Sequence, residues 1–246
     1  MRNVIVTGGS RGLGLAISRK LASGGYRAIA IARRDSDERR SAHQEADTQQ
    51  MGSVEFRCFD LSDVFKIRNF IQSIRNEYGP IYGLVNNAAV GTSGILSRIP
   101  DPLIEQTVRL NVLSPIILTK EVVRAIMAEG SAGGRIVSIT SIVSATGFSG
   151  LTVYGATKAA IVGFTRSLAR ELGPLNITVN AIAPGFFESE MTLSLGKDQQ
   201  ARIVRRSALK RLINADDIAG VTEFLMGNAA ANITGTVVTV DAGSIA

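Results

Sequence analysis

The chain has 246 residues, of which 45% are hydrophobic and 20% are charged, and its formal net charge is +6. This composition is typical of a globular protein with a large core and excludes a disordered chain. The basic residues are dispersed, and the densest groups are Arg33/Arg34, Arg39/Arg40 and Arg202/Arg205/Arg206. Because no recognition motif accompanies them, we interpret them as solvated surface or as a site for an anionic small molecule, and we expect no nucleic-acid partner.

Cys58 is the only cysteine and His43 the only histidine. One cysteine cannot form an intrachain disulfide, and its apolar, strand-like surroundings predict a buried structural thiol. His43 lies in a very polar stretch, so we place it on the surface, and no second histidine is present to share a metal or to build a triad with serine and aspartate. We expect no metal, no signal peptide and no membrane span, and therefore a cytoplasmic protein.

Short apolar runs rich in β-branched residues alternate with longer amphipathic stretches. In chain order they predict strand Val4–Val6, helix Gly12–Gly24, strands Ala28–Ile31 and Val54–Phe59, helix Asp63–Tyr78, strand Gly83–Val85, helix Pro102–Glu129, strand Arg135–Ile139, helix Thr152–Leu172, strand Thr178–Ile182, helices Lys197–Arg206 and Asp216–Met226, and strand Val237–Val240. The pattern predicts an α/β fold, a doubly wound parallel sheet of Rossmann type with helices on both faces. We expect one domain over residues 1–246, with a substrate-side lid at roughly 186–212.

A glycine-rich turn joins the first strand to the first helix, with Gly8, Gly12 and Gly14 in a Gly-x-x-x-Gly-x-Gly spacing. Glycines let the backbone approach a pyrophosphate, and the helix N-terminus supplies N–H donors and a positive dipole end. A plain turn is the alternative interpretation. The residues predicted to bind a dinucleotide are Gly8, Ser10, Arg11, Gly12, Leu13 and Gly14.

The end of the second predicted strand indicates which dinucleotide is bound. Sites that prefer NAD place a carboxylate there on the ribose 2′-hydroxyl, but this chain has Ala32 followed by Arg33 and Arg34. Guanidinium groups bind a 2′-phosphate well, and Arg11 can approach the same phosphate from the glycine turn. Unless these are merely solvated arginines, the cofactor is NADP(H).

Two further loops follow predicted strands at the same edge of the sheet. Asp60 and its neighbour Leu61 are candidates for the adenine, with a carboxylate that could accept from the amino group, although a helix cap is the competing interpretation of Asp60. Asn87 and Ala88 could line the adenosine ribose, or could simply form a loop.

Tyr154 and Lys158 are four residues apart in a predicted helix, so they share a face. A nearby ammonium group and a positively charged nicotinamide would lower the pKa of the phenol and let it act as an acid or base near neutrality. Tyr-x-x-x-Lys alone is common. Ser141, just after a predicted strand and at its carboxyl end, makes a catalytic site the better interpretation.

These signposts, in order, resemble those of the short-chain dehydrogenase/reductase family over essentially the whole chain. The resemblance implies that Tyr154 protonates a substrate carbonyl, that Ser141 stabilises the developing charge, and that Lys158 lowers the Tyr154 pKa and binds the nicotinamide ribose. It also implies that Asn111 holds a water that relays protons to Lys158. Pro184, Gly185, Phe187 and Ser189 would lie against the nicotinamide.

Residues 183–192 are similar to those of bacterial 3-oxoacyl-[acyl-carrier-protein] reductases, which implies a 3-oxoacyl thioester or another small carbonyl as substrate. Acyl carrier protein or a CoA thioester is then a possible partner. Ala132 and Leu175 stand where that subfamily has basic residues for carrier docking, which puts the carrier in doubt. Arg124, Arg166 and Arg170 are possible substitutes.

Three other activities remain open. A catalytically silent, nucleotide-sensing Rossmann protein would need a broken catalytic set, whereas Asn, Ser, Tyr and Lys are all present here. An alcohol dehydrogenase that prefers NAD and a basic nucleic-acid binder are the other rivals. The helices 102–129 and 152–172 carry more apolar and small residues than a one-sided surface helix needs, so we expect a homotetramer or homodimer.

Overall fold

The computed structural model describes residues 1–49, 52–130, 133–187 and 197–246. Within these ranges, seven strands form one parallel sheet in the order β3-β2-β1-β4-β5-β6-β7. The strands are β1 (Arg2–Thr7), β2 (Tyr26–Ala32), β3 (Ser53–Cys58), β4 (Ile81–Asn86), β5 (Gly134–Ile139), β6 (Ile177–Pro184) and β7 (Val237–Val240). The predicted doubly wound sheet is therefore confirmed.

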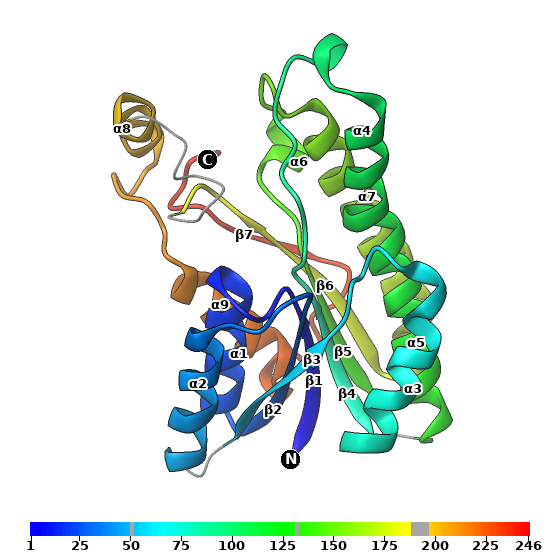
Figure 1. Cartoon of the computed structure of the whole chain (residues 1–246). Helices are drawn as coiled ribbons and strands as arrows, with labels where there is room; N and C mark the ends of the chain where they lie inside the picture. Colours follow the sequence, from blue (N-terminus) through cyan, green and yellow to red (C-terminus); the bar gives the residue numbers. More distant parts are fainter. Residues whose placement is uncertain (50–51, 131–132, 188–196) are drawn as a thin grey trace.

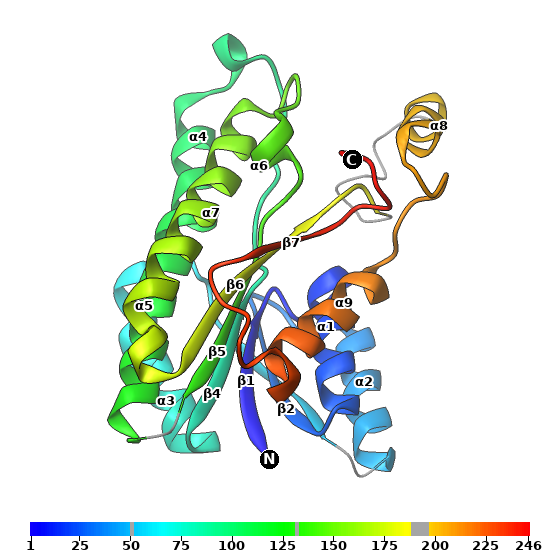
Figure 2. The ribbon, with the colours of Figure 1, turned by 180° about the vertical axis from the view of Figure 1, so that it is seen from behind.

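Helices cover both faces of the sheet (Figure 1). The α-helices are α1 (Gly12–Ser23), α2 (Asp37–Gln49), α3 (Ile67–Tyr78), α4 (Asp101–Val108), α5 (Ser114–Ala128), α6 (Val143–Thr146), α7 (Thr152–Leu172), α8 (Lys197–Arg206) and α9 (Ala215–Met226). Helices α1, α2 and α9 lie on one side, and α3, α4, α5 and α7 on the other, as the view from behind also shows (Figure 2).

The central strands are buried on both faces because each face supports its own apolar core. Strand β5 is buried at every residue, as is β6. Side chains such as Ile5, Leu84 and Ile136 pack toward α3, α5 and α7, whereas Val6, Val85 and Val137 pack toward α1 and α9. This is the two-sided burial that a continuous apolar run predicts in a parallel sheet.

Helix α2 was not predicted from the sequence. Its residues are mostly charged or polar, so no apolar stripe marks it. Among the side chains of α2 that the structure describes, the apolar Ala42 and Ala46 bury a small contact against Leu15, Ala22 and Val54. A helix that buries so little is stabilised by its neighbours and by its acidic first turn rather than by an amphipathic pattern.

Two predicted helices are divided in the structure. The helix expected at 63–78 begins with a 3₁₀ turn, Val64–Lys66, before α3. The helix expected at 102–129 consists of α4, a π-helical turn at Arg109–Leu113, and α5. π-Helical turns occur frequently at functional sites, and this one contains Asn111.

The predicted burial of Cys58 was wrong, and His43, predicted at the surface, is only partly exposed. Cys58 is exposed, because it ends β3, the edge strand of the sheet, and its thiol donates to the Arg33 carbonyl at 3.3 Å. His43 is half-buried on α2, where its Nδ1 lies 3.1 Å from the Val54 carbonyl oxygen. The error for Cys58 arose because the local sequence does not show which strand lies at the edge of the sheet.

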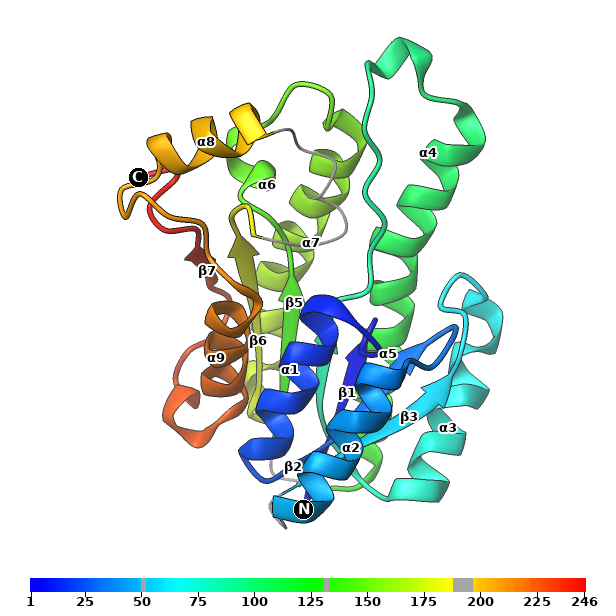
Figure 3. The same ribbon diagram turned by 60° about the vertical axis from the view of Figure 1, so that its left-hand side comes forward.

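The sheet order places the site at one end of the molecule. Strand β1 pairs with β2 on one side and with β4 on the other. Strands β1 to β3 are therefore added toward one edge of the sheet and β4 to β7 toward the other, and the order switches between β1 and β4. Ligands of doubly wound sheets bind at the carboxyl ends of strands beside such a switch point. Figure 3 shows α8 beyond those carboxyl ends, at the same end of the molecule as α6.

Candidate active site

The turn between β1 and α1 has the backbone that its glycines predict. Gly8 and Gly12 adopt left-handed φ angles of +66° and +53°. A residue with a side chain would be strained at these angles. A Cβ on Gly14 would lie 2.1 Å from the Gly8 carbonyl oxygen, so helix and turn touch only because residue 14 is glycine. The N-cap residue Arg11 makes no side-chain cap and the first turn of α1 holds no acid, which leaves the positive helix end for an anion.

Thr7 and Asn87 support this turn from below. The Thr7 hydroxyl accepts hydrogen bonds from the backbone N–H groups of Asn87 and Ala88, each at 2.9 Å. The Asn87 side-chain amide donates to the Thr7 carbonyl at 2.8 Å. Asn87 therefore connects the end of β4 to the glycine turn. The sequence argument did not include this supporting role. The position of Thr7 immediately before Gly8 could have indicated it.

The loop after β3 is held by the Asp60 carboxylate. The Asp60 Oδ1 accepts from the Ser62 backbone N–H at 2.9 Å and from its hydroxyl at 2.7 Å, so Asp60 caps the following turn. These bonds, and then the charge of Arg33, lower the Asp60 pKa. Leu61 is only 7% exposed and its side chain belongs to the core, which leaves its backbone as the part that could contact the adenine.

The arginines after β2 are separated by burial. Arg33 and Arg34 are exposed, as a phosphate site requires. Arg39, which the sequence grouped with solvated surface residues, is only 8% exposed and is paired with Asp35. Sequence reasoning missed this pair because a four-residue spacing across a loop–helix junction does not show that the two side chains are buried.

Ser141, Tyr154 and Lys158 meet beyond the end of β5. Ser141 lies two residues after that strand, and Tyr154 and Lys158 lie on α7. The Ser141 side chain lies close enough to the Tyr154 hydroxyl to lower the Tyr154 pKa. The Lys158 Nζ lies 5.5 Å from the centre of the Tyr154 ring. The three predicted residues are thus within one small volume, although they come from two separate elements.

Burial controls the protonation of this cluster. Lys158 is 4% exposed and donates to the Ile139 carbonyl at 2.9 Å, and burial lowers its pKa to about 8. Burial raises the pKa of Tyr154, and the nearby Ser141 side chain offsets only part of that rise. The side chains of the protein alone therefore move the Tyr154 pKa in the direction opposite to the predicted lowering by Lys158.

Asn111 is buried in the π-helical turn with its side chain fully engaged. Its Oδ1 accepts from the Val90 N–H at 2.9 Å, and its Nδ2 donates to the Val90 carbonyl at 2.9 Å and to the Thr157 hydroxyl at 3.2 Å. Thr157 donates in turn to the Tyr154 carbonyl at 2.7 Å. Asn111 therefore connects this turn to the catalytic helix α7.

The segment after β6 faces the same region. Gly185 donates to the Val240 carbonyl at 2.8 Å, and the Ile142 N–H donates to the Pro184 carbonyl at 3.1 Å, which holds this segment against the Ser141 loop. Phe187 forms an isolated bridge with Ile213. Phe186 lies 5.7 Å from Phe148, ring centre to ring centre, an aromatic pair that the sequence argument missed. Ser189 and Ala132 lie outside the described residues.

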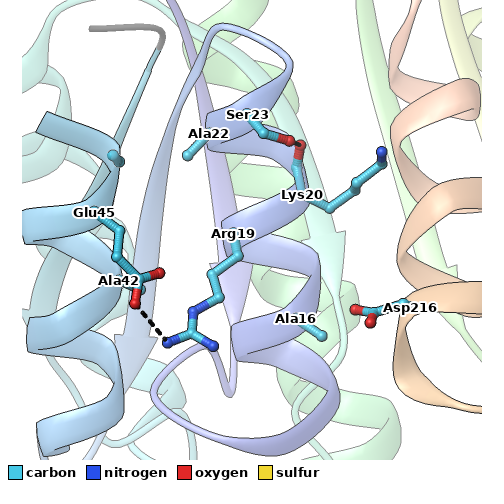
Figure 4. A pocket seen from close by; sticks show the side chains of 9 residues that line it. Ala16, Arg19, Lys20, Ala22, Ser23, Ala42, Glu45 and Asp216 are labelled. Carbon is cyan, nitrogen blue, oxygen red and sulfur yellow. Dashed lines mark hydrogen bonds and ion pairs between the residues drawn. The ribbon is translucent and has the colours of Figure 1, made fainter. Parts of the chain in front are cut away.

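A groove on the outer surface of α1 lies apart from these residues (Figure 4). Its lining comes from α1, α2 and α9, and consists of Ala16, Arg19, Lys20, Ala22, Ser23, Ala42, Glu45, Ala46 and Asp216. Charged residues of the lining pair with one another, as Arg19 and Glu45 do at 3.7 Å. Across the described ranges, no three His, Cys, Asp or Glu side chains are grouped so as to hold a metal ion. No helix in the same ranges is both long and apolar enough to cross a membrane.

Residues 2–200 match the sequence model of the short chain dehydrogenase family. The chain belongs to this family. The 3-oxoacyl-[acyl-carrier-protein] reductase FabG of Escherichia coli (strain K12) is 36% identical over 240 residues, covering 97% of this chain and 95% of the relative. The FabG of Pseudomonas aeruginosa is 37% identical over 241 residues, with the same coverage of 97% and 95%.

Solved structures of similar proteins show the same fold. A short chain dehydrogenase from Burkholderia cenocepacia J2315, in complex with NADP, is 31% identical, with a TM-score of 0.91 over 100% of this chain and 98% of the other. A blue fluorescent protein from a metagenomic library, in complex with NADPH, has the same TM-score of 0.91 and 31% identity, and the same coverage of 100% and 98%.

Proposed function

We propose that this protein is an NADP(H)-dependent reductase that converts a ketone, in a 3-oxoacyl thioester or another small carbonyl compound, to a secondary alcohol. The observation that carries the proposal is the convergence of Ser141 and Tyr154, with Lys158 one helical turn away and its Nζ 5.5 Å from the centre of the Tyr154 ring. Three polar groups of this kind converge where a doubly wound sheet binds its ligand.

The residues of the glycine turn fit a dinucleotide. The uncapped, acid-free N-terminus of α1 suits a pyrophosphate, and Gly12 leaves open space where a side chain would otherwise stand. Exposed Arg33, with Arg34 and Arg11, suits a 2′-phosphate. The titles of two similar structures, which name NADP and NADPH, support the same choice. When bound, the nicotinamide supplies the hydride.

The side chains of the protein supply the proton and the polarisation. Tyr154 Oη would donate its proton to the carbonyl oxygen of the substrate, and its raised pKa keeps that proton in place until the oxygen becomes basic. The Ser141 hydroxyl, close to that of Tyr154, would donate to the same oxygen and stabilise its developing charge. Lys158, whose pKa of about 8 lies near neutrality, would return a proton to Tyr154 after each turnover.

Asn111 would act through structure rather than by binding a proton-relay water with its amide. Both of its N–H donors are engaged, with Val90 and with Thr157. A π-helical turn shifts the backbone hydrogen bonds by one residue, as the bond from Ser114 N to the Arg109 carbonyl shows. We therefore assign a water to a backbone carbonyl of this turn, and to Asn111 the role of holding the turn against α7.

Reduction of a panel of carbonyl compounds with NADPH tests the proposal. The panel should pair a 3-oxoacyl thioester with its free ketone analogue. The thioester should be tested both on CoA and on acyl carrier protein. The names of the FabG relatives favour the thioester. Turnover of the free ketone alone would redirect the substrate assignment. Absence of turnover with tight NADPH binding would favour the silent nucleotide sensor, and faster alcohol oxidation with NAD would favour an NAD-dependent alcohol dehydrogenase.

We also propose that the protein assembles as a homodimer or homotetramer through α4, α5 and α7. Leu103 and Val108 on α4 are 38% and 43% exposed, Leu113 in the π-helical turn is 39% exposed, and Met127 on α5 is 53% exposed. On α7, Ala159, Ala160 and Gly163 are exposed and small enough to let another helix approach. An apolar face of this kind is the usual surface for a two-fold contact.

A further inference from the structure

The turn between β2 and α2 contains one carboxylate, Asp35, directly after the two arginines that we assign to the 2′-phosphate. Such a carboxylate would oppose phosphate binding in two ways. It would repel the phosphate directly, and it would compete with it for Arg33 and Arg34. The preference of the site for NADP(H) therefore depends on where the charge of Asp35 is directed.

Arg39 neutralises Asp35 with a two-point contact. Its Nε donates to Asp35 Oδ1 at 2.8 Å, and its Nη2 donates to Asp35 Oδ2 at 2.9 Å. This is the parallel geometry in which a guanidinium group binds a carboxylate most strongly. The contact with Arg39 is the largest cause of a lowered Asp35 pKa, so Asp35 remains charged and directed toward α2.

Arg39 is held in this position from its other side. Its Nη1 donates to the Val54 carbonyl of β3 at 3.1 Å, and its guanidinium carbon lies 5.7 Å from the centre of the Phe56 ring. The Arg39 side chain is 10% exposed and that of Asp35 23%. Arg40 also contacts Asp35, at 3.3 Å, but its side chain is 53% exposed, so water screens that pair.

The same turn is joined to the glycine-rich turn. The Ser36 hydroxyl donates to the Ser10 carbonyl at 2.5 Å and accepts from the Arg39 backbone N–H at 3.0 Å. The start of α2 is thereby fixed against the turn that we assign to the pyrophosphate. Arg33 and Arg34, by contrast, form no ion pair within the described ranges, although the charge of Arg33 acts on the Asp60 carboxylate.

We propose that Arg39 is a specificity-determining positioning residue: by binding Asp35 it keeps that carboxylate away from Arg33 and Arg34, and so permits NADP(H) binding. Arg39 is buried against β3 and need not touch the cofactor. The inference rests on the proposed NADP(H) dependence. It adds that the preference is set by a neutralised carboxylate as well as by the exposed arginines.

Titration of nicotinamide fluorescence with NADPH and with NADH tests this inference, because the chain has no tryptophan to interfere. In Arg39→Gln, Asp35 is released, so we expect the Kd for NADPH to rise about five- to tenfold and that for NADH to change less than about twofold. In the double variant Arg39→Gln/Asp35→Asn, the NADPH Kd should return to within about twofold of the parent value. Arg40→Gln, a matched control on the exposed partner, should change either Kd less than about twofold.

Asp35→Asn alone keeps the test decisive if Arg39→Gln fails to fold. With Arg39 intact and the carboxylate absent, we expect NADPH binding to be unchanged or up to about threefold tighter, with NADH unchanged. Equal weakening of both cofactors in Arg39→Gln without rescue by the double variant, or selective loss of NADPH binding in Asp35→Asn, would overturn the inference. If the parent protein itself shows no preference for NADPH, the proposed function fails instead.

Discussion

The ammonium group of Lys158 lies 5.5 Å from the centre of the Tyr154 ring, yet its hydrogen bond goes to the Ile139 carbonyl at the end of β5. Lys158 thus joins the catalytic helix to the central sheet. Because Lys158 is buried, the position that makes it useful beside Tyr154 also disfavours its charged form.

Removing the phenol of Tyr154 tests the catalytic assignment. In Tyr154→Phe the ring remains but the proton donor is lost, so we expect kcat to fall by about a thousandfold. The Kd for NADPH should change less than about threefold, because the glycine turn is untouched. Steady-state kinetics and cofactor titration measure the two effects. Tyr78→Phe, on α3, is the matched control and should keep normal turnover. A Tyr154→Phe variant with near-parental kcat would exclude Tyr154 as the general acid.

Lys158 predicts a specific pH dependence of stability. Burial lowers its pKa from 10.5 to about 8, so between these values the unfolded chain binds a proton that the folded chain does not. Stability should therefore rise with pH across this window, by on the order of 3 kcal/mol at most, and the full penalty should remain below pH about 8. Urea unfolding of the parent and of Lys158→Met at several pH values measures the difference.

The variant lacks this titration, so any stability advantage that it holds near neutrality should shrink as the pH rises above about 8. Loss of the hydrogen bond to the Ile139 carbonyl shifts the whole curve of the variant without changing its slope. Parallel stability curves for the two proteins would show that Lys158 titrates normally in the fold.

Gly14 and Gly12 should respond differently to alanine. In Gly14→Ala the new methyl group meets the Gly8 carbonyl oxygen and the Asn87 side chain, so we expect a loss of about 2–3 kcal/mol in the free energy of unfolding. Gly12 is left-handed but open, so Gly12→Ala should cost only about 1 kcal/mol. Its methyl group would nevertheless occupy the phosphate space and weaken NADPH binding at least about tenfold. Equal stability losses in the two variants would contradict this contrast.

The exposed arginines after β2 predict the cofactor preference of the unmodified protein. Charge-assisted hydrogen bonds from Arg33 and Arg11, reduced by solvent screening, should favour NADPH over NADH by about tenfold to a few hundredfold. Ala32→Asp/Arg33→Ile should weaken NADPH and leave NADH binding unchanged or improved. Fluorescence titration at physiological salt measures both. Equal or tighter NADH binding by the parent would refute the preference and leave the fold and the catalytic residues unaffected.

The apolar surface of α4, α5 and α7 predicts self-association. Sedimentation equilibrium at micromolar concentration should give a dimer or tetramer, and Val108→Glu should shift the distribution toward smaller species, because a buried charge opposes the contact. NADPH binding should be retained in that variant, since Val108 lies outside the glycine turn. A monomeric parent protein would rule out assembly through these helices.

Local sequence was sufficient for the features that depend on local physics. The order of the strands along the chain, the glycine turn and the Tyr154–Lys158 spacing all follow from side-chain periodicity, from φ preferences and from the pitch of a helix. These properties belong to short stretches and hold wherever the stretch is placed. Ser141 followed from its place at the carboxyl end of a predicted strand, and the family resemblance added Asn111.

Tertiary structure alone decided the features that depend on neighbours distant in sequence. Cys58 is exposed because β3 is the edge strand of the sheet. Arg39 is buried because β3 packs beside α2. Asn111 is hydrogen-bonded because Val90 and Thr157 lie beside it. The pKa values of Tyr154 and Lys158 likewise follow from burial, which is a property of the packed core. A residue's type predicts what its side chain can do, but only packing determines its solvent, its partners and hence its charge.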